Sequence, residues 1–321
     1  MPTRRVSYRG FGVALQVPDG VPASLRSLRR GGAGAGPRPE GLKAGLELRD
    51  APPVSAARRD PSGASAFLSS FYGSGGASTP DKDAILKMSL KDQVASTHWY
   101  HTIELPGGVV TPGIFDHRPL VPHYGIPESL RGKRCLDAAC SNGFWTFEFE
   151  RRGGTVVSVD IPSLSELDFP AGTPPMPAAT AGGPDQLSAI AYHVARRALG
   201  SDAELVRSNL YAMNPENLGT FDFVHLADVL LHLQNPLAAL CRLRELTAPG
   251  GTALIAEVFD PSLIGTVTHY FGGFDGLVWW EPSLDCLAQM VYDAGFATVD
   301  VVRTYRTPLR GHWRAVIRAM A

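Results

Sequence analysis

Two acidic residues stand at either end of the stretch 134–160, RCLDAACSNGFWTFEFERRGGTVVSVD. Asp137 closes one apolar run, and Asp160 closes a second run after the turn that contains Gly143. An acid about twenty residues beyond such a turn suits a ribose diol, because both hydroxyls can donate to one carboxylate. The stretch therefore predicts a nucleoside-binding crevice.

The elements that must position these acids follow from the same stretch. We expect a buried strand over 134–138, a tight turn over 139–143, a helix over 144–152 and a second strand ending at Asp160. Short, continuously apolar strands are typical of a parallel sheet that is covered on both faces. A ligand of such a sheet lies across the carboxyl ends of its strands.

The turn also restricts the kind of nucleoside. A dinucleotide site requires G-x-G-x-x-G, whereas this turn has one glycine, Gly143. It has no Lys or Arg to meet a phosphate, which excludes a P-loop. The pattern resembles motif I of class I S-adenosylmethionine-dependent methyltransferases, with Ala139 in place of the usual first glycine.

Composition sets wider limits. The chain has 321 residues, 44% hydrophobic and 19% charged, enough for one to two domains. A net charge of −1 conceals a basic start, since residues 1–60 hold eleven Lys or Arg against five Asp or Glu. The four cysteines show no CxxC spacing, so we expect buried thiols and neither a metal site nor a disulfide framework.

Targeting signals are weak. Arg4 and Arg5 are followed by a short apolar run over 11–17 that ends at Pro18 without a cleavage site. No run approaches the 18 apolar residues that a membrane span needs. We therefore expect a cytoplasmic protein that contacts no membrane.

Three regions are expected. Residues 1–80 form a Gly-, Ala- and Arg-rich extension, at most partly ordered, with a short strand over 6–17. It is either an RNA- or partner-contacting arm or a solvated extension. Residues 81–128 begin with an amphipathic helix, become irregular and form part of the substrate site. Residues 129–321 form the main domain, with a cap insertion over 161–200 that includes a helix at 187–199.

The fold class expected for the main domain is α/β. We expect a Rossmann-like, seven-stranded, mostly parallel sheet with helices on both faces and a C-terminal antiparallel strand pair. The remaining strands are expected at 204–210, from 221, at 252–259, 297–303 and 313–320, and the remaining helices at 235–251 and 283–294.

Residues 96–320 resemble a class I methyltransferase, and more narrowly the family that modifies the wobble uridine of bacterial tRNA. The resemblance covers about two-thirds of the chain and depends on an ordered set of blocks. These are HWYHTIELPGGVVTPG (98–113), FDHRP (115–119), LRGKRCLDAACSNGFWTFEFERRGG (130–154), FDFVHLADVLLHLQNPLAAL (221–240) and EPSLDCLAQMVYDAGF (281–296).

The resemblance implies S-adenosyl-L-methionine as cofactor and assigns residues to it. Asp137 and the turn would face its methionine end, Asp160 its ribose, residues 208–210 its adenine, and Ala227 its sulfonium. The implied cofactor residues are Asp137, Ala139, Cys140, Asn142, Gly143, Asp160, Ser208, Asn209, Leu210 and Ala227.

One departure from the tRNA family bears on the cofactor. That family carries a Tyr-His pair where this chain has Leu231 and His232. The tyrosine helps to read the carboxylate of an unusual carboxylated cofactor. Leucine cannot donate that hydrogen bond, and a buried carboxylate without a partner costs several kcal/mol. We therefore expect ordinary S-adenosylmethionine.

Methyl transfer mainly requires alignment, and a base is needed only for acceptors such as a hydroxyl or a protonated amine. Histidine is the best suited base near neutral pH. The catalytic candidates are His232, His101 and Asp228. The substrate-site candidates are His98, Trp99, Tyr100, Glu257, His269 and Trp279.

Three functions remain open. The leading one is methyl transfer to a small molecule, such as an aromatic secondary metabolite, because the chain after residue 60 is net acidic. The second is tRNA modification, which should require a basic face around the cleft. The third is a cofactor-binding protein that performs a non-methylating reaction such as a cyclisation. The sequence leaves the acceptor atom and the oligomeric state open.

Overall fold

The computed structural model describes residues 4–7, 14–17, 82–173, 188–306 and 311–321. The chain divides into two compact units, 1–57 and 58–321. In the first unit, β1 (Arg4–Ser7) pairs antiparallel with β2 (Ala14–Val17). The one strand expected over 6–17 is therefore wrong, because two strands form there instead. The rest of the expected extension lies outside the described residues.

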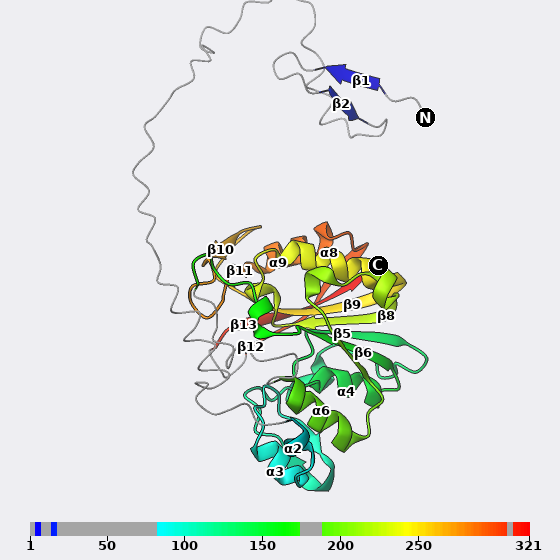
Figure 1. Cartoon of the computed structure of the whole chain (residues 1–321). Coiled ribbons are helices and arrows are strands. Elements are labelled where there is room, and N and C mark those ends of the chain that lie inside the picture. The colour runs from blue at the N-terminus through cyan, green and yellow to red at the C-terminus, as the bar shows by residue number, and fades with distance from the viewer. Residues whose placement is uncertain (1–3, 8–13, 18–81, 174–187, 307–310) are drawn as a thin grey trace, which may run out of the picture. The chain divides into compact units, whose positions relative to one another are not determined.

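The second unit contains a seven-stranded sheet in the order β12-β13-β9-β8-β5-β6-β7 (Figure 1). Strands β9, β8, β5, β6 and β7 are parallel, and β13 and β12 are added antiparallel. The expected α/β fold class is thus confirmed. The strands are β5 (Arg134–Ala138), β6 (Thr155–Asp160), β7 (Glu204–Arg207), β8 (Phe221–Ala227), β9 (Thr247–Phe259), β12 (Thr298–Arg306) and β13 (Trp313–Met320).

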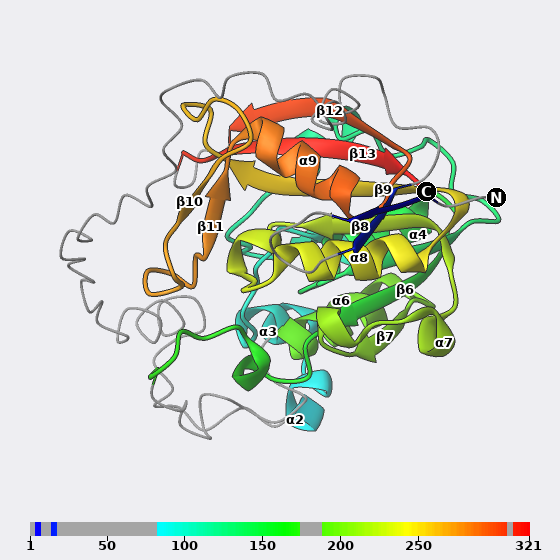
Figure 2. The same cartoon turned by 90° about the horizontal axis from the view of Figure 1, so that it is seen from above.

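Helices cover both faces of the sheet, as its continuously buried strands require. On one face α4 packs against β5 and β6, and α6 lies beside it with α3 (Figure 1). On the other face lie α8 and α9, which Figure 2 views from above. The helices are α3 (Leu90–Ala95), α4 (Phe144–Arg151), α6 (Ser188–Leu199), α8 (Pro236–Leu246) and α9 (Leu284–Asp293).

Two apolar clusters form the core, one on each face. Phe149 and Tyr192 are fully buried on the side of α4 and α6, and Leu240 and Phe296 on the side of α8 and α9. Burying one such side chain contributes about 1.5–3 kcal/mol, so the two clusters hold the strand ends in a fixed arrangement.

The single helix expected from residue 81 is wrong. Two short helices form instead, α2 (Lys82–Leu86) and α3, and the second begins where the Ser89 hydroxyl accepts from the backbone N–H of Asp92. A serine that caps a new helix competes with continuation of the preceding one. Consequently His98 and His101 do not lie on a helix, and His101 forms a bridge with Phe115.

Strand ends also differ from expectation. The last residues of the helix expected over 235–251, which end in Pro-Gly-Gly, lie inside β9 instead. There the pairing of β8 with β9 shifts register between Phe221 and Phe223. Strand β7 is shorter than expected and β12 is longer. Small further strands form the pairs β3–β4 (Glu104–Leu105, Val109–Val110) and β10–β11 (Thr268–Tyr270, Trp280–Pro282). Among the described helices, none has the length and apolar character to cross a bilayer.

Candidate functional site

A cavity of about 240 Å³ lies at the carboxyl ends of β5, β6 and β8. Asp137 of β5, Asp160 at the end of β6 and Ala227 at the end of β8 all line it. Most of the residues that the sequence singled out meet there. They are Tyr100, His101, Asp137, Ala139, Asp160, Ser208, Asn209, Leu210, Ala227, Asp228 and His232.

The other candidates lie outside the cavity lining, which does not include Cys140, Asn142, Gly143, His98, Trp99, Glu257, His269 and Trp279. Trp99 is buried and its Nε1 donates to the carbonyl oxygen of Val94 at 3.0 Å. Trp279 is also buried, and its Nε1 donates to the carbonyl oxygen of Asp168 at 2.8 Å. His269 lies on the exposed strand β10. Trp99 and Trp279 therefore contribute to packing rather than to the cavity surface.

The turn between β5 and α4 has an unusual backbone. Ala139 and Ser141 have φ of 58° and 50°, and Gly143 has φ of 86°. A Cβ at Gly143 would lie 2.8 Å from Phe147, so only glycine fits at the start of α4. The side-chain oxygen of Asn142 accepts from the backbone N–H groups of Tyr100 and His101. The turn is therefore fastened to the segment that carries His101.

Asp137 anchors a buried polar chain, which we define as Tyr124, His225, Asp137, Thr146 and Ser158. One carboxylate oxygen lies 3.0 Å from Nδ1 of His225, whose Nε2 lies 3.1 Å from the Tyr124 hydroxyl. The other oxygen accepts from the Thr146 hydroxyl at 2.6 Å, and Thr146 and Ser158 are 2.8 Å apart. Asp137 thus lines the cavity, while each of its carboxylate oxygens already has a hydrogen-bond partner, His225 or Thr146.

Two buried histidines, His101 and His117, face the same cavity. Their ring centroids are 5.4 Å apart, and His117 also stacks on Trp145. Burial lowers the pKa of His101 well below its usual value, and burial lowers the pKa of His117 to about 4. Nδ1 of His101 has no hydrogen-bond partner among the described residues. Both rings are therefore neutral at pH 7.

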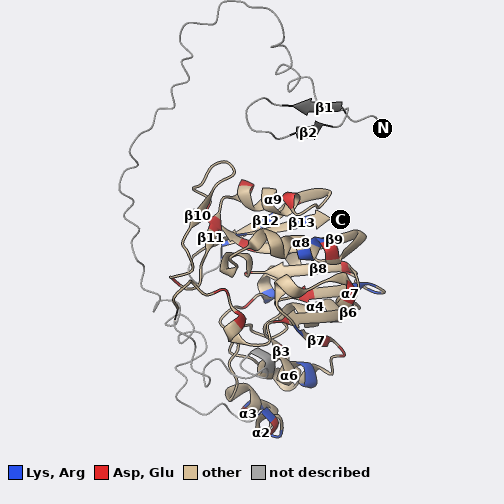
Figure 3. Cartoon of the chain, turned by 45° about the horizontal axis from the view of Figure 1, so that its top comes forward, with Lys and Arg blue, Asp and Glu red and all other residues tan. Residues whose placement is uncertain are grey.

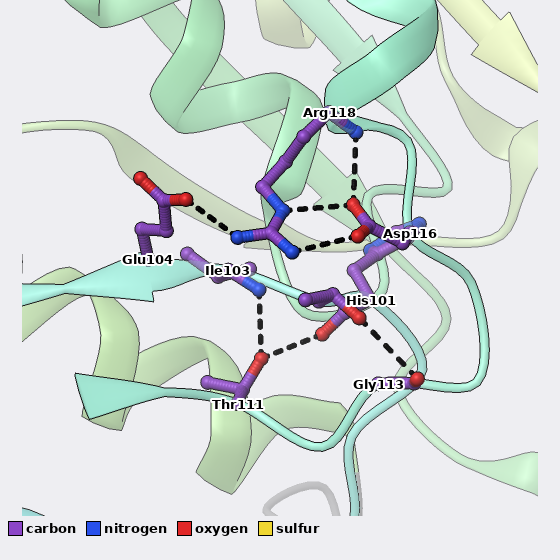
Figure 4. Close-up of polar contacts among 8 residues, drawn as sticks. His101, Ile103, Glu104, Thr111, Gly113, Asp116 and Arg118 are labelled. Carbon is purple, nitrogen blue, oxygen red and sulfur yellow. Dashed lines mark hydrogen bonds and ion pairs between the residues drawn. The ribbon is translucent and has the colours of Figure 1, made fainter. Parts of the chain in front are cut away.

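The backbone that carries His101 is held by a tight crossing (Figure 4). The Thr111 hydroxyl accepts from the Ile103 N–H and donates to the His101 carbonyl oxygen, each at 2.8 Å. Gly113 lies directly against this backbone, and a Cβ there would lie 2.0 Å from the carbonyl carbon of His101. We call residues 98–118 the histidine segment.

The far end of the histidine segment is fastened at the surface. Arg118 donates to both carboxylate oxygens of Asp116 at 2.8 and 2.7 Å, and to Glu104 at 2.5 Å (Figure 4). Asp116 and Arg118 flank His117 in the sequence, and the contact of Arg118 with Glu104 links this part of the loop to β3. The backbone on either side of His117 is therefore held by a charged cluster on the surface, while its ring packs against Phe115 and Trp145.

The short helix η6 (Leu230–His232) carries His232, another histidine of the cavity lining. Nδ1 of His232 lies 3.0 Å from the Leu277 carbonyl oxygen. A carbonyl only accepts, so Nδ1 bears the proton, and in the neutral ring the lone pair is on Nε2. Asp228, with φ of 52°, accepts from Nε of Arg314 at 2.5 Å rather than from a histidine.

Glu257 does not point into the cavity. Its carboxylate accepts from the backbone N–H groups of Val229, Leu230 and Val258 at 2.9, 2.5 and 2.8 Å. Burial, together with the nearby Asp228 carboxylate, raises the pKa of Glu257 to about 8. Its role in the structure is to hold the loop that follows β8, because it is the acceptor for two N–H groups of that loop.

Part of the segment expected to form a cap lines the cavity. Residues 161–173 contribute apolar side chains to the lining, among them Ile161 and Leu167. The Asp168 carboxylate accepts from the Tyr211 hydroxyl at 2.5 Å and from the Gln234 N–H at 2.6 Å. This part of the cap is thereby bound to the loops after β7 and β8. Residues 174–187 of the expected cap lie outside the described residues.

Sequence reasoning did not single out several of the polar lining residues, among them His117, His312 and Arg314. His117 lies within the block FDHRP, which resembles the family, and a polar residue in such a block could have indicated a site residue. Arg314 lies within a mostly apolar strand, β13, which is a signal for a buried ion pair. Nothing in the local sequence of His312 indicates that it lines a cavity.

Comparisons with known proteins agree with this arrangement. A family model described as a methyltransferase domain matches residues 119–301. A tRNA U34 carboxymethyltransferase from Geobacter sp. (strain M21) is 26% identical over 59% of this chain, and the match spans about half (51%) of that relative's length. A ubiquinone biosynthesis O-methyltransferase from Psychrobacter arcticus is 23% identical over 58% of this chain and 68% of its own length.

Among solved structures, the N-terminal domain of EvdMO1, determined in the presence of SAH and D-fucose, is similar to this chain. The TM-score is 0.51, at 16% identity, over 77% of this chain and 99% of that chain. At that identity the likeness shows the fold alone.

Proposed function

Because this chain belongs to the methyltransferase domain family of enzymes, we propose that it transfers a methyl group from S-adenosylmethionine to a small-molecule acceptor. One observation carries the proposal. Most of the residues expected to hold the cofactor, together with the histidines His101 and His232, line one cavity of about 240 Å³.

The residues of the cavity fit that cofactor. Asp160 offers a carboxylate to a ribose diol at the end of β6, and residues 208–210 lie along the next strand end, on the adenine side. Ala139 and Ser141 have positive φ, which brings backbone rather than bulky side chains toward the methionine end. When bound, S-adenosylmethionine supplies an electrophilic methyl group on sulfur.

The acceptor would lie between the histidine segment and η6. Tyr100, Phe115 and Trp145 give this side of the cavity flat apolar surfaces, which suit a planar acceptor. Cap residues such as Leu167 exclude water from above. Holding the acceptor in line in such a pocket supplies most of what methyl transfer requires, since good alignment is equivalent to effective molarities of about 10⁵–10⁸ M.

A proton from a hydroxyl acceptor would pass to a histidine. His232 has a fixed tautomer with its lone pair on Nε2 in the neutral ring. His101 and His117 are also neutral, but burial lowers the pKa of each ring, so both are poor proton acceptors at pH 7. We assign His232 as the base, because its proton-bearing Nδ1 is held by the Leu277 carbonyl, and His101 as an acceptor-contacting residue.

The test begins with binding. Asp160→Ala should weaken the affinity for S-adenosylhomocysteine at least tenfold in calorimetry, since hydrogen bonds to a charged group contribute about 1.5–3 kcal/mol each. Asp202→Ala, on an exposed loop, is the matched control and should bind as the parent does. The proposal is overturned if the parent protein gives no heat of binding with S-adenosylmethionine or with S-adenosylhomocysteine.

Turnover is measured as S-adenosylhomocysteine release over a panel of phenolic, heteroaromatic and sugar acceptors. His232→Ala should lower kcat by about 10²–10⁴ for a hydroxyl acceptor while leaving cofactor affinity unchanged. Binding without turnover across the panel would favour a non-methylating reaction on the same fold.

A tRNA acceptor is the second candidate, favoured by the relatives named as tRNA U34 carboxymethyltransferases. Against it, Lys and Arg are interspersed with Asp and Glu over the described elements from residue 82 onward (Figure 3). Leu231 also lines the cavity at the position of the family's tyrosine. Retention of tRNA by the intact protein at low salt, lost on a salt gradient, would support this candidate.

A further inference from the structure

A mixed cluster of ligating side chains lies at the end of β9, apart from the residues assigned to methyl transfer. Asp260, His269 and Glu281 each place one ligand atom within 4.8 Å of the other two. One imidazole and two carboxylates form a donor set typical of zinc and related first-row dications. The set differs from an ordinary surface patch of acids because it includes an imidazole nitrogen.

The backbone holds these three residues together. His269 and Glu281 are directly paired across β10 and β11, so their side chains lie on the same face. The backbone N–H of Asp260 donates to the carbonyl oxygen of Pro282 at 2.8 Å, which fixes the end of β9 against β11. The cluster is therefore assembled from three chain segments by main-chain hydrogen bonds.

The orientation of Asp260 is also fixed. Its Oδ1 accepts from the N–H and hydroxyl of Ser262 at 2.8 and 2.7 Å. Its Oδ2 is the atom that faces His269, 3.8 Å from Nδ1. Hydrogen bonds that orient a carboxylate in this way are typical of metal ligands.

A fourth donor is close by. Nδ1 of His312 lies 3.5 Å from Oε1 of Glu281, and His312 lines the cavity. We propose that Asp260, His269 and Glu281 bind one first-row transition dication such as Zn²⁺ beside the mouth of the cavity. The bound ion ties the β10–β11 pair to the end of β9. This proposal does not depend on the methyl-transfer function, and it departs from the sequence-based expectation that the chain has no metal site.

The ligand atoms are somewhat farther apart than in an occupied site, where metal–ligand bonds of about 2.0–2.2 Å bring tetrahedral ligands to roughly 3.4 Å from one another. Small side-chain rotations close this gap. The side chain of His269 is 52% exposed and that of Glu281 is 21% exposed, so surrounding packing does not oppose the movement.

Cobalt(II) is the probe, because a nitrogen- and oxygen-ligated Co²⁺ gives visible absorption bands without any turnover. The experiment uses the untagged, full-length, chelator-treated protein at neutral pH, since a histidine tag would itself bind cobalt. A saturable signal of one equivalent, displaced by Zn²⁺, is expected. His269→Ala and Glu281→Gln should each weaken Co²⁺ affinity at least about tenfold.

Matched controls are His123→Ala and Asp275→Asn, which change an exposed histidine and an exposed acid outside the cluster and should leave the signal unchanged. Zn²⁺ should also raise the Tm of the parent protein but not of the two cluster variants. The proposal is overturned if the parent gives no saturable signal, or if both cluster variants bind cobalt as the parent does.

Discussion

His101 and His117 are the residues whose environment departs most from what their type would suggest. Each is an imidazole in an almost dry site, and each is neutral because burial lowers its pKa. Neutral rings cost little to keep inside a protein, whereas a charged ring there has no counter-ion close enough to offset its desolvation. Acidification therefore acts on both function and stability through these two side chains.

We predict a specific pH dependence for His117. Its pKa is about 4 in the folded protein against an ordinary value of 6.5, so the unfolded state binds the proton first. The stabilisation is present above pH 6.5 and is lost as pH falls from 6.5 toward 4, by up to about 3 kcal/mol.

Urea unfolding at pH 7.0, 5.5 and 4.5 measures this effect. His117→Gln should lose less free energy of unfolding over that range than the parent, because glutamine does not titrate. His101 shifts in the same direction, so part of the slope remains in the variant. Equal slopes for parent and variant would contradict the assignment.

At the scale of elements, the histidine segment depends on a close backbone crossing rather than on a helix. Gly113→Ala would place a Cβ 2.0 Å from the carbonyl carbon of His101, so the backbone at Gly113 must move away from the backbone at His101. We expect a loss of about 2 kcal/mol or more in stability together with a fall in acceptor turnover.

The control is Gly108→Ala in the turn of the same segment. Gly108 has φ of 71° and no atom within 4 Å of a Cβ, so alanine there adds only backbone strain of about 1–2 kcal/mol. If the two variants lose the same stability and turnover, the crossing is not what positions His101.

Some elements of the sheet could be predicted from the sequence. The runs that became β5, β6 and β13 are short and mostly apolar, so their periodicity and flanking residues predicted both ends of β5 and β13 and the carboxyl end of β6. The carboxyl-end rule then predicted where Asp137, Asp160 and Ala227 would converge, because it follows from the parallel sheet alone.

What the sequence did not predict depends mostly on contacts between distant residues, with one local exception. The division of the first helix at Ser89 is a local effect of capping, yet an amphipathic pattern continued across it. The burial of His117 and its fastening by Asp116 and Arg118 follow from tertiary packing. The bonding of Glu257 to backbone N–H groups likewise requires the folded loop after β8.

At the scale of the whole molecule, the cavity and both core clusters are formed by residues from 82 onward. A fragment of residues 58–321, one of the two compact units, should therefore unfold cooperatively with the parent's Tm and bind S-adenosylhomocysteine with unchanged affinity. Calorimetry and thermal denaturation measure both quantities.

Asp160→Ala within that fragment is the negative control for binding. Any low-salt retention of tRNA should decrease in the fragment, since many of the chain's cationic residues are removed with the first unit. Weaker cofactor binding by the fragment would mean that residues before 58 contribute to the pocket.

The charged fastening of Glu104, Asp116 and Arg118 has an evolutionary consequence. It secures the proposed acceptor side of the pocket from outside, without involving the parallel strands that carry Asp137 and Asp160. We therefore expect acceptor preference to change more readily through residues 98–118 than through those strands. A library randomised on the inner face of that stretch should contain more folded members with altered preference than one randomised along β5 and β8.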